Sequence, residues 1–301
     1  MKHVHGANAA LVTARRPSGN EIDIGPALEI LDFLTDRGVQ GIALLGATGE
    51  FPHFDFEERK RFSQMAIRRS RVPVLINVSH STLEGALTLS RDALASGAAG
   101  ILLMPPYFFT YKQEELKEFY FRYADAATGF PPVYLYNLPF FTNSLEPQTA
   151  CEILATGQFA GIKDSSGNLA MFDALAAQRT STPFSLLIGN DSILAAKRHL
   201  CDGVISGCAC AVPELIVALD CAVVSANTEW KQRLELRLQE FIGKIDKFPT
   251  PLGVQEALAL RGFQKTLAPT RLGPTLQAHR EAFRTWFPEW LPAMLQDAAA
   301  A

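Results

Sequence analysis

A lysine closes one apolar run of the chain, and a tyrosine closes the run before it. Residues 159–162 lead into Lys163 in FAGIKDSSGN, and PVYLYN ends at Tyr136 and Asn137. A lysine amine that loses its hydration in apolar surroundings tends to release its proton, and the free amine can attack a ketone to form a Schiff base. A neighbouring phenol can transfer the protons of such a reaction. Taken singly, each has a plainer interpretation: a lysine that extends past the strand end into water, and a tyrosine ring that fills the core.

A second group of residues suits a carboxylate. The second apolar run ends in GATGE, in which Gly46 and Gly49 flank Ala47 and Thr48. A turn of this kind exposes backbone N–H groups, and these donors with the Thr48 hydroxyl would bind an oxyanion or a carboxylate. The alternative is a tight turn in which Glu50 only caps or pairs. An amine, a phenol and a carboxylate site together are what imine chemistry on a 2-oxo acid requires.

The elements that would position these residues repeat along the chain. Eight short apolar runs alternate with amphipathic stretches, and continuously apolar runs are typical of parallel strands covered on both faces. Eight such units, with no G-x-G-x-x-G after the first run, predict an α/β fold of the (β/α)8 TIM barrel type rather than a doubly wound sheet. Strand ends meet at one face of a barrel, and its fifth and sixth strands are neighbours. The runs begin at Asn8, Gly41, Val74, Gly100, Pro132, Phe159, Phe184 and Gly203.

Helix signals separate these runs. Asp55 followed by Glu58, and Ser81 followed by Glu84, have the capping-box spacing that opens a helix, and Gly97 would end the second helix. After the eighth run the chain continues with three more helical patterns, broken by proline and glycine.

We therefore predict a catalytic barrel over residues 1–227 and a C-terminal helical extension, packed on the barrel, over residues 228–301. Side chains of a strand alternate between its two sides, so Gly161 shares a side with Lys163. We expect the glycine to leave room below the lysine.

Composition restricts the partners and the location. The 301 residues are 48% hydrophobic and 20% charged, with a net charge of -3, which indicates a globular protein without affinity for nucleic acid or anionic membranes. No apolar stretch reaches the ~18 residues of a membrane span, and no apolar segment follows the pair Arg15 and Arg16 as a twin-arginine signal requires. We expect a cytoplasmic protein. Cys208 and Cys210, expected on one face of a strand, are interpreted as buried thiols rather than a metal or redox pair.

With these motifs in this order, the sequence resembles the dihydrodipicolinate synthase / N-acetylneuraminate lyase superfamily. GATGE, YNLP and GIKDSSGN carry the resemblance, with AALVT, MPPYF, GND and GVISG, over nearly the whole chain. The resemblance implies that Lys163 forms the Schiff base, that Tyr136 shuttles protons, and that Thr48 with the Ala47 and Thr48 backbone holds the 2-oxo acid carboxylate. It also implies that the Ile205 main chain borders pyruvate. It implies no metal or organic cofactor, and a homotetramer built as a dimer of dimers.

Three positions depart from the synthase pattern of that superfamily. The first threonine of the carboxylate motif is Ala47, the second tyrosine, which reaches across a dimer contact, is Phe108, and the arginine that binds a semialdehyde carboxylate is Phe141. Ala47 and Phe108 cannot pass protons, and Phe141 cannot make a bidentate contact. Asp191 matches a position at which sialic-acid lyases contact a sugar hydroxyl. With Phe140, the phenylalanines suggest a more apolar acceptor pocket, unless they serve core or interface packing.

We therefore predict a class I lyase whose partners are a small 2-oxo acid, such as pyruvate, and an aldehyde, and specifically an aldolase of a 2-keto-3-deoxy sugar acid or a related 2-oxo acid. The nearest alternatives are a 4-hydroxy-tetrahydrodipicolinate synthase and a keto-deoxy sugar acid dehydratase. An apolar or aromatic aldehyde is also compatible with the phenylalanines. A metal-dependent hydrolase has only the pair His3 and His5 in its favour, and this pair precedes the first run instead of closing it. A non-catalytic barrel would also tolerate the missing relay residues.

Overall fold

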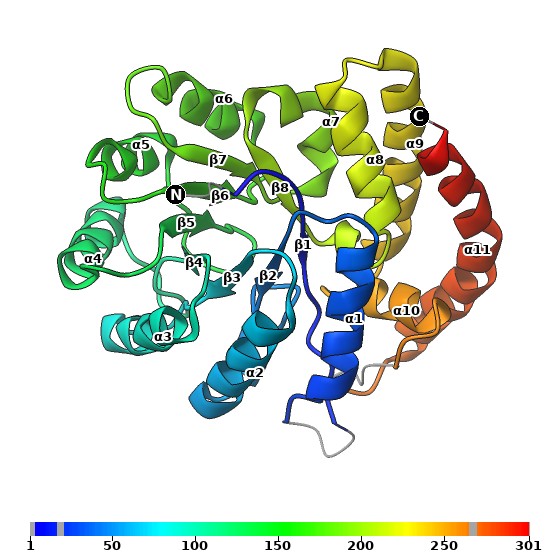
Figure 1. Ribbon diagram of the computed structural model, residues 1–301, viewed down its shortest axis with the longest axis horizontal. Coiled ribbons are helices and arrows are strands. Elements are labelled where there is room, and N and C mark those ends of the chain that lie inside the picture. Colours follow the sequence, from blue (N-terminus) through cyan, green and yellow to red (C-terminus); the bar gives the residue numbers. More distant parts are fainter. Residues whose placement is uncertain (1–3, 17–20, 265–269, 301) are drawn as a thin grey trace.

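Eight parallel strands close into a barrel in the computed structural model, which describes residues 4–16, 21–264 and 270–300 (Figure 1). Each strand pairs with the next along the chain, and the first pairs with the eighth. The predicted (β/α)8 barrel is thereby confirmed. The strands are β1 (Gly6–Ala10), β2 (Gly41–Leu44), β3 (Val74–Asn77), β4 (Gly100–Leu103), β5 (Val133–Asn137), β6 (Gly161–Asp164), β7 (Ser185–Ile188) and β8 (Gly203–Ser206).

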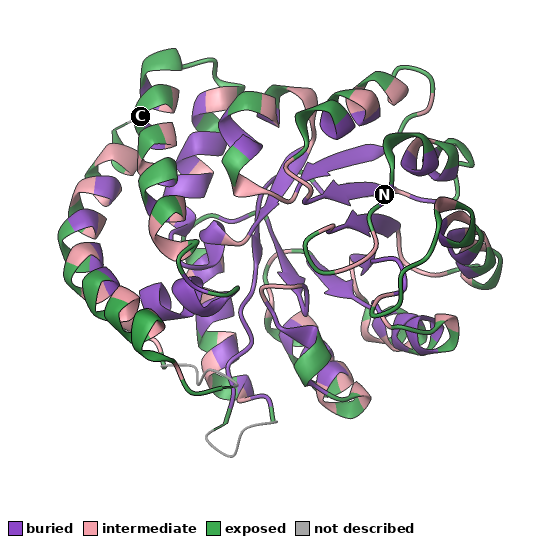
Figure 2. Cartoon of the chain, turned by 180° about the vertical axis from the view of Figure 1, so that it is seen from behind, coloured by how far each residue is buried: buried purple, intermediate pink, exposed green. Residues whose placement is uncertain are grey.

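Helices follow the strands and form the outer layer. Figure 2 shows the strands buried at the centre, while the surrounding helices alternate buried and exposed residues along their length, as expected of amphipathic helices on a core. The helices are α1 (Ile24–Asp36), α2 (Phe56–Arg69), α3 (Leu83–Ser96), α4 (Gln113–Ala126), α5 (Pro147–Ala155), α6 (Leu169–Gln178), α7 (Leu194–Lys197) and α8 (Pro213–Val224), with short 3-10 turns η1 (Phe51–His53), η2 (Asp191–Ile193), η3 (Arg198–Leu200) and η4 (Cys208–Cys210).

Two of the three predicted helix boundaries are correct. The Asp55 carboxylate accepts a hydrogen bond from the Glu58 N–H at 2.9 Å and caps α2. Gly97, in the left-handed conformation at φ 81°, ends α3. The expected cap at Ser81 is wrong by one residue, because it is the Thr82 hydroxyl that accepts from the N–H of the third residue on.

Three further helices lie beyond α8 on one side of the barrel: α9 (Thr228–Ile245), α10 (Leu252–Leu260) and α11 (Pro274–Ala299) (Figure 1). Helices α9 and α11 both contact α8, and aromatic rings join them to each other. The Phe241 ring of α9 stacks on Trp290 of α11 with centroids 5.5 Å apart. The division of the chain at residue 227 stays a prediction. None of the described helices has the length and apolar character that a membrane span requires, and the cytoplasmic location stays a prediction.

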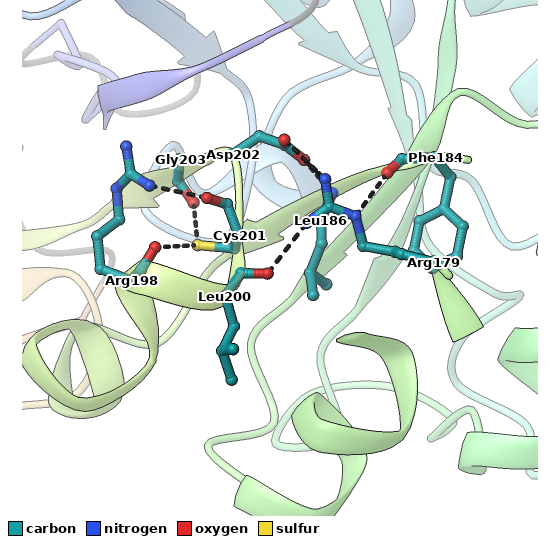
Figure 3. Close-up of polar contacts among 8 residues, drawn as sticks. All are labelled: Arg179, Phe184, Leu186, Arg198, Leu200, Cys201, Asp202 and Gly203. Carbon is teal, nitrogen blue, oxygen red and sulfur yellow. Dashed lines mark hydrogen bonds and ion pairs between the residues drawn. The ribbon is translucent and has the colours of Figure 1, made fainter. Parts of the chain in front are cut away.

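The amino ends of β7 and β8 are held together by a cluster of polar contacts (Figure 3). Arg179 binds both carboxylate oxygens of Asp202 at 2.8 and 2.9 Å and also donates to the backbone carbonyls of Phe184 and Leu200. Asp202 accepts in turn from the Leu186 N–H at 2.8 Å. This guanidinium–carboxylate pair therefore sets the relative position of two strands whose opposite ends reach the candidate site.

The two closely spaced cysteines do not lie on a strand. Cys208 and Cys210 belong to η4, the turn that follows β8, because the chain bends at Gly207 after the last strand residue. Both are free and buried, as expected of structural thiols. Burial raises the pKa of the Cys210 thiol to about 12, so it stays protonated at neutral pH.

Candidate active site

Lys163 and Tyr136 stand side by side at the carboxyl end of the barrel. They are direct partners in the register of β5 and β6, and the Lys163 Nζ lies 4.1 Å from the centroid of the Tyr136 ring. Only 4% of the lysine and 2% of the tyrosine is exposed. The lysine therefore does not extend past the strand end into water, and the two groups on which imine chemistry would depend meet as the strand order predicts.

A buried polar contact joins the same two strands one residue further on. The Asn137 side-chain amide donates to the Asp164 carboxylate at 2.7 Å, and the Ser166 hydroxyl donates to it at 2.7 Å. The Asn137 oxygen accepts from the Leu145 N–H at 3.0 Å. Burial raises the pKa of the Asp164 carboxyl, although the hydrogen bonds from Ser166 and Asn137 oppose this. The contact holds β5 and β6 in the register that places the lysine next to the phenol.

Gly189, rather than Gly161, leaves the space that the lysine uses. A Cβ on Gly189 would come within 2.8 Å of the Lys163 Cε and 2.0 Å of the Ser165 hydroxyl. A Cβ on Gly161 would instead collide with the Ser185 carbonyl at 2.0 Å. The expectation for Gly161 was wrong, because this glycine allows the close approach of β7 rather than making room for the lysine.

The GATGE turn brings Ala47 and Thr48 to the same cavity. Gly46 lies next to the tyrosine, since a Cβ there would be 3.9 Å from the phenol oxygen. Gly49 does not line the cavity: a Cβ on it would be 2.8 Å from the Leu45 N–H nitrogen, so its role is to close the turn. Ala47 and Thr48 therefore line the cavity that contains the lysine, and their binding of a carboxylate stays a prediction.

Glu50 lies behind this turn and pairs with other residues, as the alternative interpretation of GATGE expected. Its carboxylate is 3.1 Å from the Arg15 guanidinium and accepts from Gln255 of α10 at 2.8 Å. Arg15 also contacts the His53 ring, which lies 3.4 Å from the same carboxylate. This buried group connects the turn at the end of β2 to the C-terminal extension.

The strand ends surround a cavity of about 680 Å³. The end of α9, the segment after it and the start of α10 close the cavity on one side, so the extension contributes part of its wall. The residues that line it are Ala47, Thr48, Tyr136, Leu138, Phe140, Phe141, Lys163, Ser165, Gly189, Asn190, Asp191, Ser192, Ile205, Gly207, Cys208, Ile242, Ile245, Asp246, Phe248, Pro249, Thr250, Pro251, Gly253 and Val254.

Phe108 is absent from this wall. Its backbone is left-handed at φ 83°, and its side chain is 88% exposed, packed edge-on against Phe109. Phe108 therefore does not contribute to the cavity of its own chain, and a role in the acceptor pocket across a dimer contact stays a prediction. Phe140 and Phe141, by contrast, lie at the mouth of the cavity and are largely exposed.

The polar groups of the cavity are mostly acidic or neutral. Lys163 is the one cationic side chain among the described residues that line it, whereas Asp191 and Asp246 both contribute carboxylates. The Asp191 Oδ2 accepts from the Cys208 N–H at 3.0 Å, while its buried Oδ1 has no hydrogen-bond partner within the described residues. The hydroxyl of Ser165 is also buried and has no hydrogen-bond partner within the described residues. The sequence interpretation included Asp191 but missed Ser165, which lies two residues after the lysine, and Asp246.

The described part of the chain holds no group of three or more His, Cys, Asp or Glu residues arranged to bind a metal ion. His5 immediately precedes β1, at the opposite end of the barrel from the cavity, and His3 lies outside the described residues. Of this pair, His5 therefore does not reach the candidate site.

Fold and site together define a class: (β/α)8 barrels with a buried lysine beside a tyrosine at the ends of adjacent strands. The chain belongs to the dihydrodipicolinate synthetase family, whose model matches residues 3–286. It is 31% identical over 266 residues to a 4-hydroxy-tetrahydrodipicolinate synthase of Kosmotoga olearia, covering 86% of this chain and 88% of the relative. It is also 29% identical over 264 residues to an uncharacterised DapA-like lyase of Halobacterium salinarum, covering 86% and 85% of the two chains.

A solved structure supports the same family. The prophage protein YagE of Escherichia coli K12, in complex with pyruvate, superimposes with a TM-score of 0.85 at 26% identity, covering 95% of this chain and 98% of the other. YagE is described as a member of the dihydrodipicolinic acid synthase family. The family relationship makes this chain a lyase, and it leaves the acceptor to be inferred from the cavity.

Proposed function

We propose that this chain is an aldolase that binds a 2-oxo acid, pyruvate in particular, as a Schiff base on Lys163. The reaction joins this 2-oxo acid to a hydroxylated, uncharged aldehyde, or cleaves the product into the two. The observation that carries the proposal is the buried Lys163 amine 4.1 Å from the ring centroid of Tyr136, in a cavity with no second cation among its described lining residues. The binding of pyruvate by YagE agrees with it. The physiological substrate would be a 2-keto-3-deoxy sugar acid.

In the cleavage direction the Lys163 amine attacks C2 of the substrate, and Tyr136 donates the proton with which water leaves as the iminium forms. Breaking the C3–C4 bond moves its electron pair to the iminium nitrogen, while the proton of the C4 hydroxyl passes to the Tyr136 oxygen and the aldehyde departs. The resulting enamine is protonated at C3, and water then releases pyruvate and the free amine. Thr48 and the turn backbone would bind the substrate carboxylate throughout.

The acceptor side of the cavity favours this aldolase over the synthase. An anionic semialdehyde needs a cation for its carboxylate, but Phe141 lies at the cavity mouth, and the half-buried Asp191 and the exposed Asp246 line the cavity. Like charges in a partly dehydrated cavity repel one another. A 4-hydroxy-tetrahydrodipicolinate synthase is the second candidate, and the 31% identity to the Kosmotoga olearia enzyme favours it.

Borohydride reduction tests the Schiff base. Incubation with pyruvate and borohydride should add the mass of one reduced pyruvate per chain, on the peptide that contains Lys163. The adduct should be lost in Lys163→Ala and retained in Lys247→Ala, because Lys247 is exposed and does not line the cavity. A wild-type protein without an adduct on Lys163 would overturn the proposal and would leave the non-catalytic barrel as the better interpretation.

An aldehyde panel distinguishes the two candidate reactions. Pyruvate with glycolaldehyde or glyceraldehyde should give 4-hydroxy-2-oxo acids, whereas aspartate semialdehyde should react poorly. Turnover with aspartate semialdehyde alone would assign the synthase instead. Product formation should disappear in Lys163→Ala under either result.

The homotetramer also stays a proposal. The exposed Phe108 and Phe109, with the neighbouring Phe140 and Phe141, leave apolar surface next to the cavity mouth that a second copy could cover. Among similar solved structures is a monomeric dihydrodipicolinate synthase variant, with a TM-score of 0.85 at 24% identity and coverage of 99% of this chain and 98% of the other, so the fold alone does not dictate a tetramer. Light scattering on the purified chain gives the mass directly; a monomer would contradict the proposal.

A further inference from the structure

Asp246 comes from the C-terminal extension but faces the same cavity as the barrel residues. It follows the last residue of α9, and its neighbours Ile242 and Ile245 on that helix also line the cavity. Asp191, the first residue of the turn η2 after β7, lines the cavity from the barrel side. Two carboxylates thus line the same cavity as the lysine, one from the barrel and one from the C-terminal extension.

These carboxylates are not neutralised by the protein. No ion pair or hydrogen bond to the Asp246 carboxylate is formed by the described residues, and the Oδ1 of Asp191 has no partner among them either. Asp246 is exposed at the cavity wall, and its partial burial, together with the Asp191 carboxylate, raises its pKa. Free carboxylate oxygens in a cavity are acceptors for the donors of a ligand.

A third group points to the same kind of ligand. The hydroxyl of Ser165 is buried, lines the cavity close to the lysine, and has no hydrogen-bond partner within the described residues, although only 4% of the residue is exposed. A buried hydroxyl without a partner is costly unless a ligand or water completes it. Two buried polar atoms, the Ser165 hydroxyl and the Asp191 Oδ1, therefore lack hydrogen-bond partners within the described residues, and the exposed Asp246 carboxylate borders the same cavity.

We propose that Asp246 is a specificity residue that, together with Asp191, accepts hydrogen bonds from an uncharged, hydroxylated substrate chain and rejects an acceptor with a terminal carboxylate. The proposal rests on the Schiff-base function proposed above and extends it to the distal end of the substrate. It assigns a role in substrate selection to the helical extension, outside the strand ends that carry the lysine and the tyrosine.

The expected size of the effect follows from the partial exposure of the site. Because Asp246 is exposed, repulsion between its carboxylate and that of a ligand is largely screened by water and changes relative binding by about 3-fold to 10-fold. Replacing one of two carboxylates removes part of this repulsion. Replacing it with a cation should reverse the preference.

Two five-carbon 2-oxo acids provide a matched pair of probes. The first, 5-hydroxy-2-oxopentanoate, ends in a hydroxyl, and the second, 2-oxoglutarate, ends in a carboxylate at the same position. Neither has a 4-hydroxyl, so neither can be cleaved by the proposed reaction. An equimolar mixture is incubated with the protein and borohydride, and the masses of the two adducts on Lys163 give their ratio.

Wild type should favour the hydroxyl-terminated adduct. Asp246→Asn should shift the ratio towards 2-oxoglutarate by about 3-fold to 10-fold, and Asp246→Lys further still. Asp125→Asn is the control, because it removes the same charge from the exposed end of α4 at the opposite end of the barrel.

The two failures are distinguishable. An adduct ratio in Asp246→Asn and Asp246→Lys that equals that of wild type, with pyruvate still trapped on Lys163, would overturn the role of Asp246 and leave the Schiff-base function intact. Absence of any pyruvate adduct in wild type would overturn the Schiff-base function and this inference with it.

Discussion

Lys163 lies directly opposite Tyr136 in the parallel register of β5 and β6, with its amine over the phenol ring at 4.1 Å from the centroid. The relationship is a property of the backbone rather than of two flexible side chains, since both residues are in strands that are buried along their whole length. A reaction that requires an amine and a proton donor in fixed positions is favoured by such an arrangement, because little motion has to be suppressed for it to proceed.

Removal of the phenol oxygen should slow the reaction and leave the packing almost unchanged. We expect Tyr136→Phe to lower kcat by about 100-fold to 10,000-fold, because a positioned acid–base group contributes on that scale. The measurement is the steady-state rate of aldehyde release or addition, with circular dichroism as a check on folding.

Tyr134→Phe is the matched control on the same strand. Its phenol interacts with the Val4 backbone and with Ser185 rather than with the cavity. We expect its loss to cost about 1 kcal/mol of unfolding free energy and little activity. Equal loss of activity in both variants would argue against a proton-transfer role for Tyr136.

Gly189→Ala tests whether the space beside the lysine matters. The new methyl group would meet the Lys163 Cε at 2.8 Å and the Ser165 hydroxyl at 2.0 Å, so the lysine would have to move. A displacement of about 1 Å is expected to slow imine formation by about 100-fold. The rate of borohydride trapping with pyruvate measures this step separately from carbon–carbon bond cleavage.

Gly243→Ala supplies the contrast. Gly243 is exposed within α9, and an added Cβ would find nothing within 4 Å. Its replacement should stabilise the chain by about 0.5–1 kcal/mol without changing trapping, because alanine favours helix more than glycine does. Unchanged trapping in Gly189→Ala would show that the lysine adapts and that the close approach has no function.

Much of the fold, and the centre of the site, could be predicted because strands that are consecutive in the sequence of a barrel lie next to each other in space. Once eight continuous apolar runs are recognised, the residues that end the fifth and sixth runs must meet, and Lys163 and Tyr136 do. The position of Thr48 at the cavity follows from the same reasoning. No long-range information beyond the repeat was needed.

What could not be predicted depends on contacts that have no periodic signal. Asp246 reaches the cavity because α9 packs on α8 and ends near the strand ends, and an amphipathic pattern does not reveal where a terminal helix will lie. Phe108 is 88% exposed and has a left-handed backbone, a conformation that phenylalanine rarely takes and that the sequence pattern does not reveal. The roles of Gly161 and Gly189 are distinguished only by the neighbouring strand and side chains.

Asp164 should make stability depend on pH in a definite direction. Its pKa in the folded chain is raised above the ordinary value of 3.8, mainly by burial. The folded state therefore binds the proton more tightly than the unfolded state, and stability falls as pH rises above 3.8 through the folded pKa. Asp164→Asn removes this titration, although it disturbs the hydrogen bonds from Asn137 and Ser166 at every pH.

We therefore expect the Tm of Asp164→Asn, relative to wild type, to be more favourable at pH 7 than at pH 4. Thermal unfolding of both proteins at the two pH values provides the comparison. A relative Tm that is the same at both values would show that Asp164 is not the group that titrates.

Glu50→Gln tests the buried ion pair behind the GATGE turn. It would leave the Arg15 guanidinium without its charged partner at 3.1 Å, in a position where both side chains are buried. We expect the unfolding free energy to fall by about 3 kcal/mol, because an unpaired buried charge is costly. Since Glu50 immediately follows Gly49, we also expect weaker binding of pyruvate, seen as a higher pyruvate concentration for half-maximal trapping.

The neighbouring pair of Arg16 and Glu21 gives the matched control for Glu50→Gln. It is an ion pair of similar length, 2.9 Å, but its side chains are 47% and 56% exposed. Solvent screens such a pair, so Glu21→Gln should change the unfolding free energy by less than about 1 kcal/mol and leave pyruvate trapping unchanged. Denaturant titrations of the two variants measure their unfolding free energies for this comparison. If Glu50→Gln behaved like Glu21→Gln in both measurements, burial of the Arg15–Glu50 pair would have no bearing on the position of the turn.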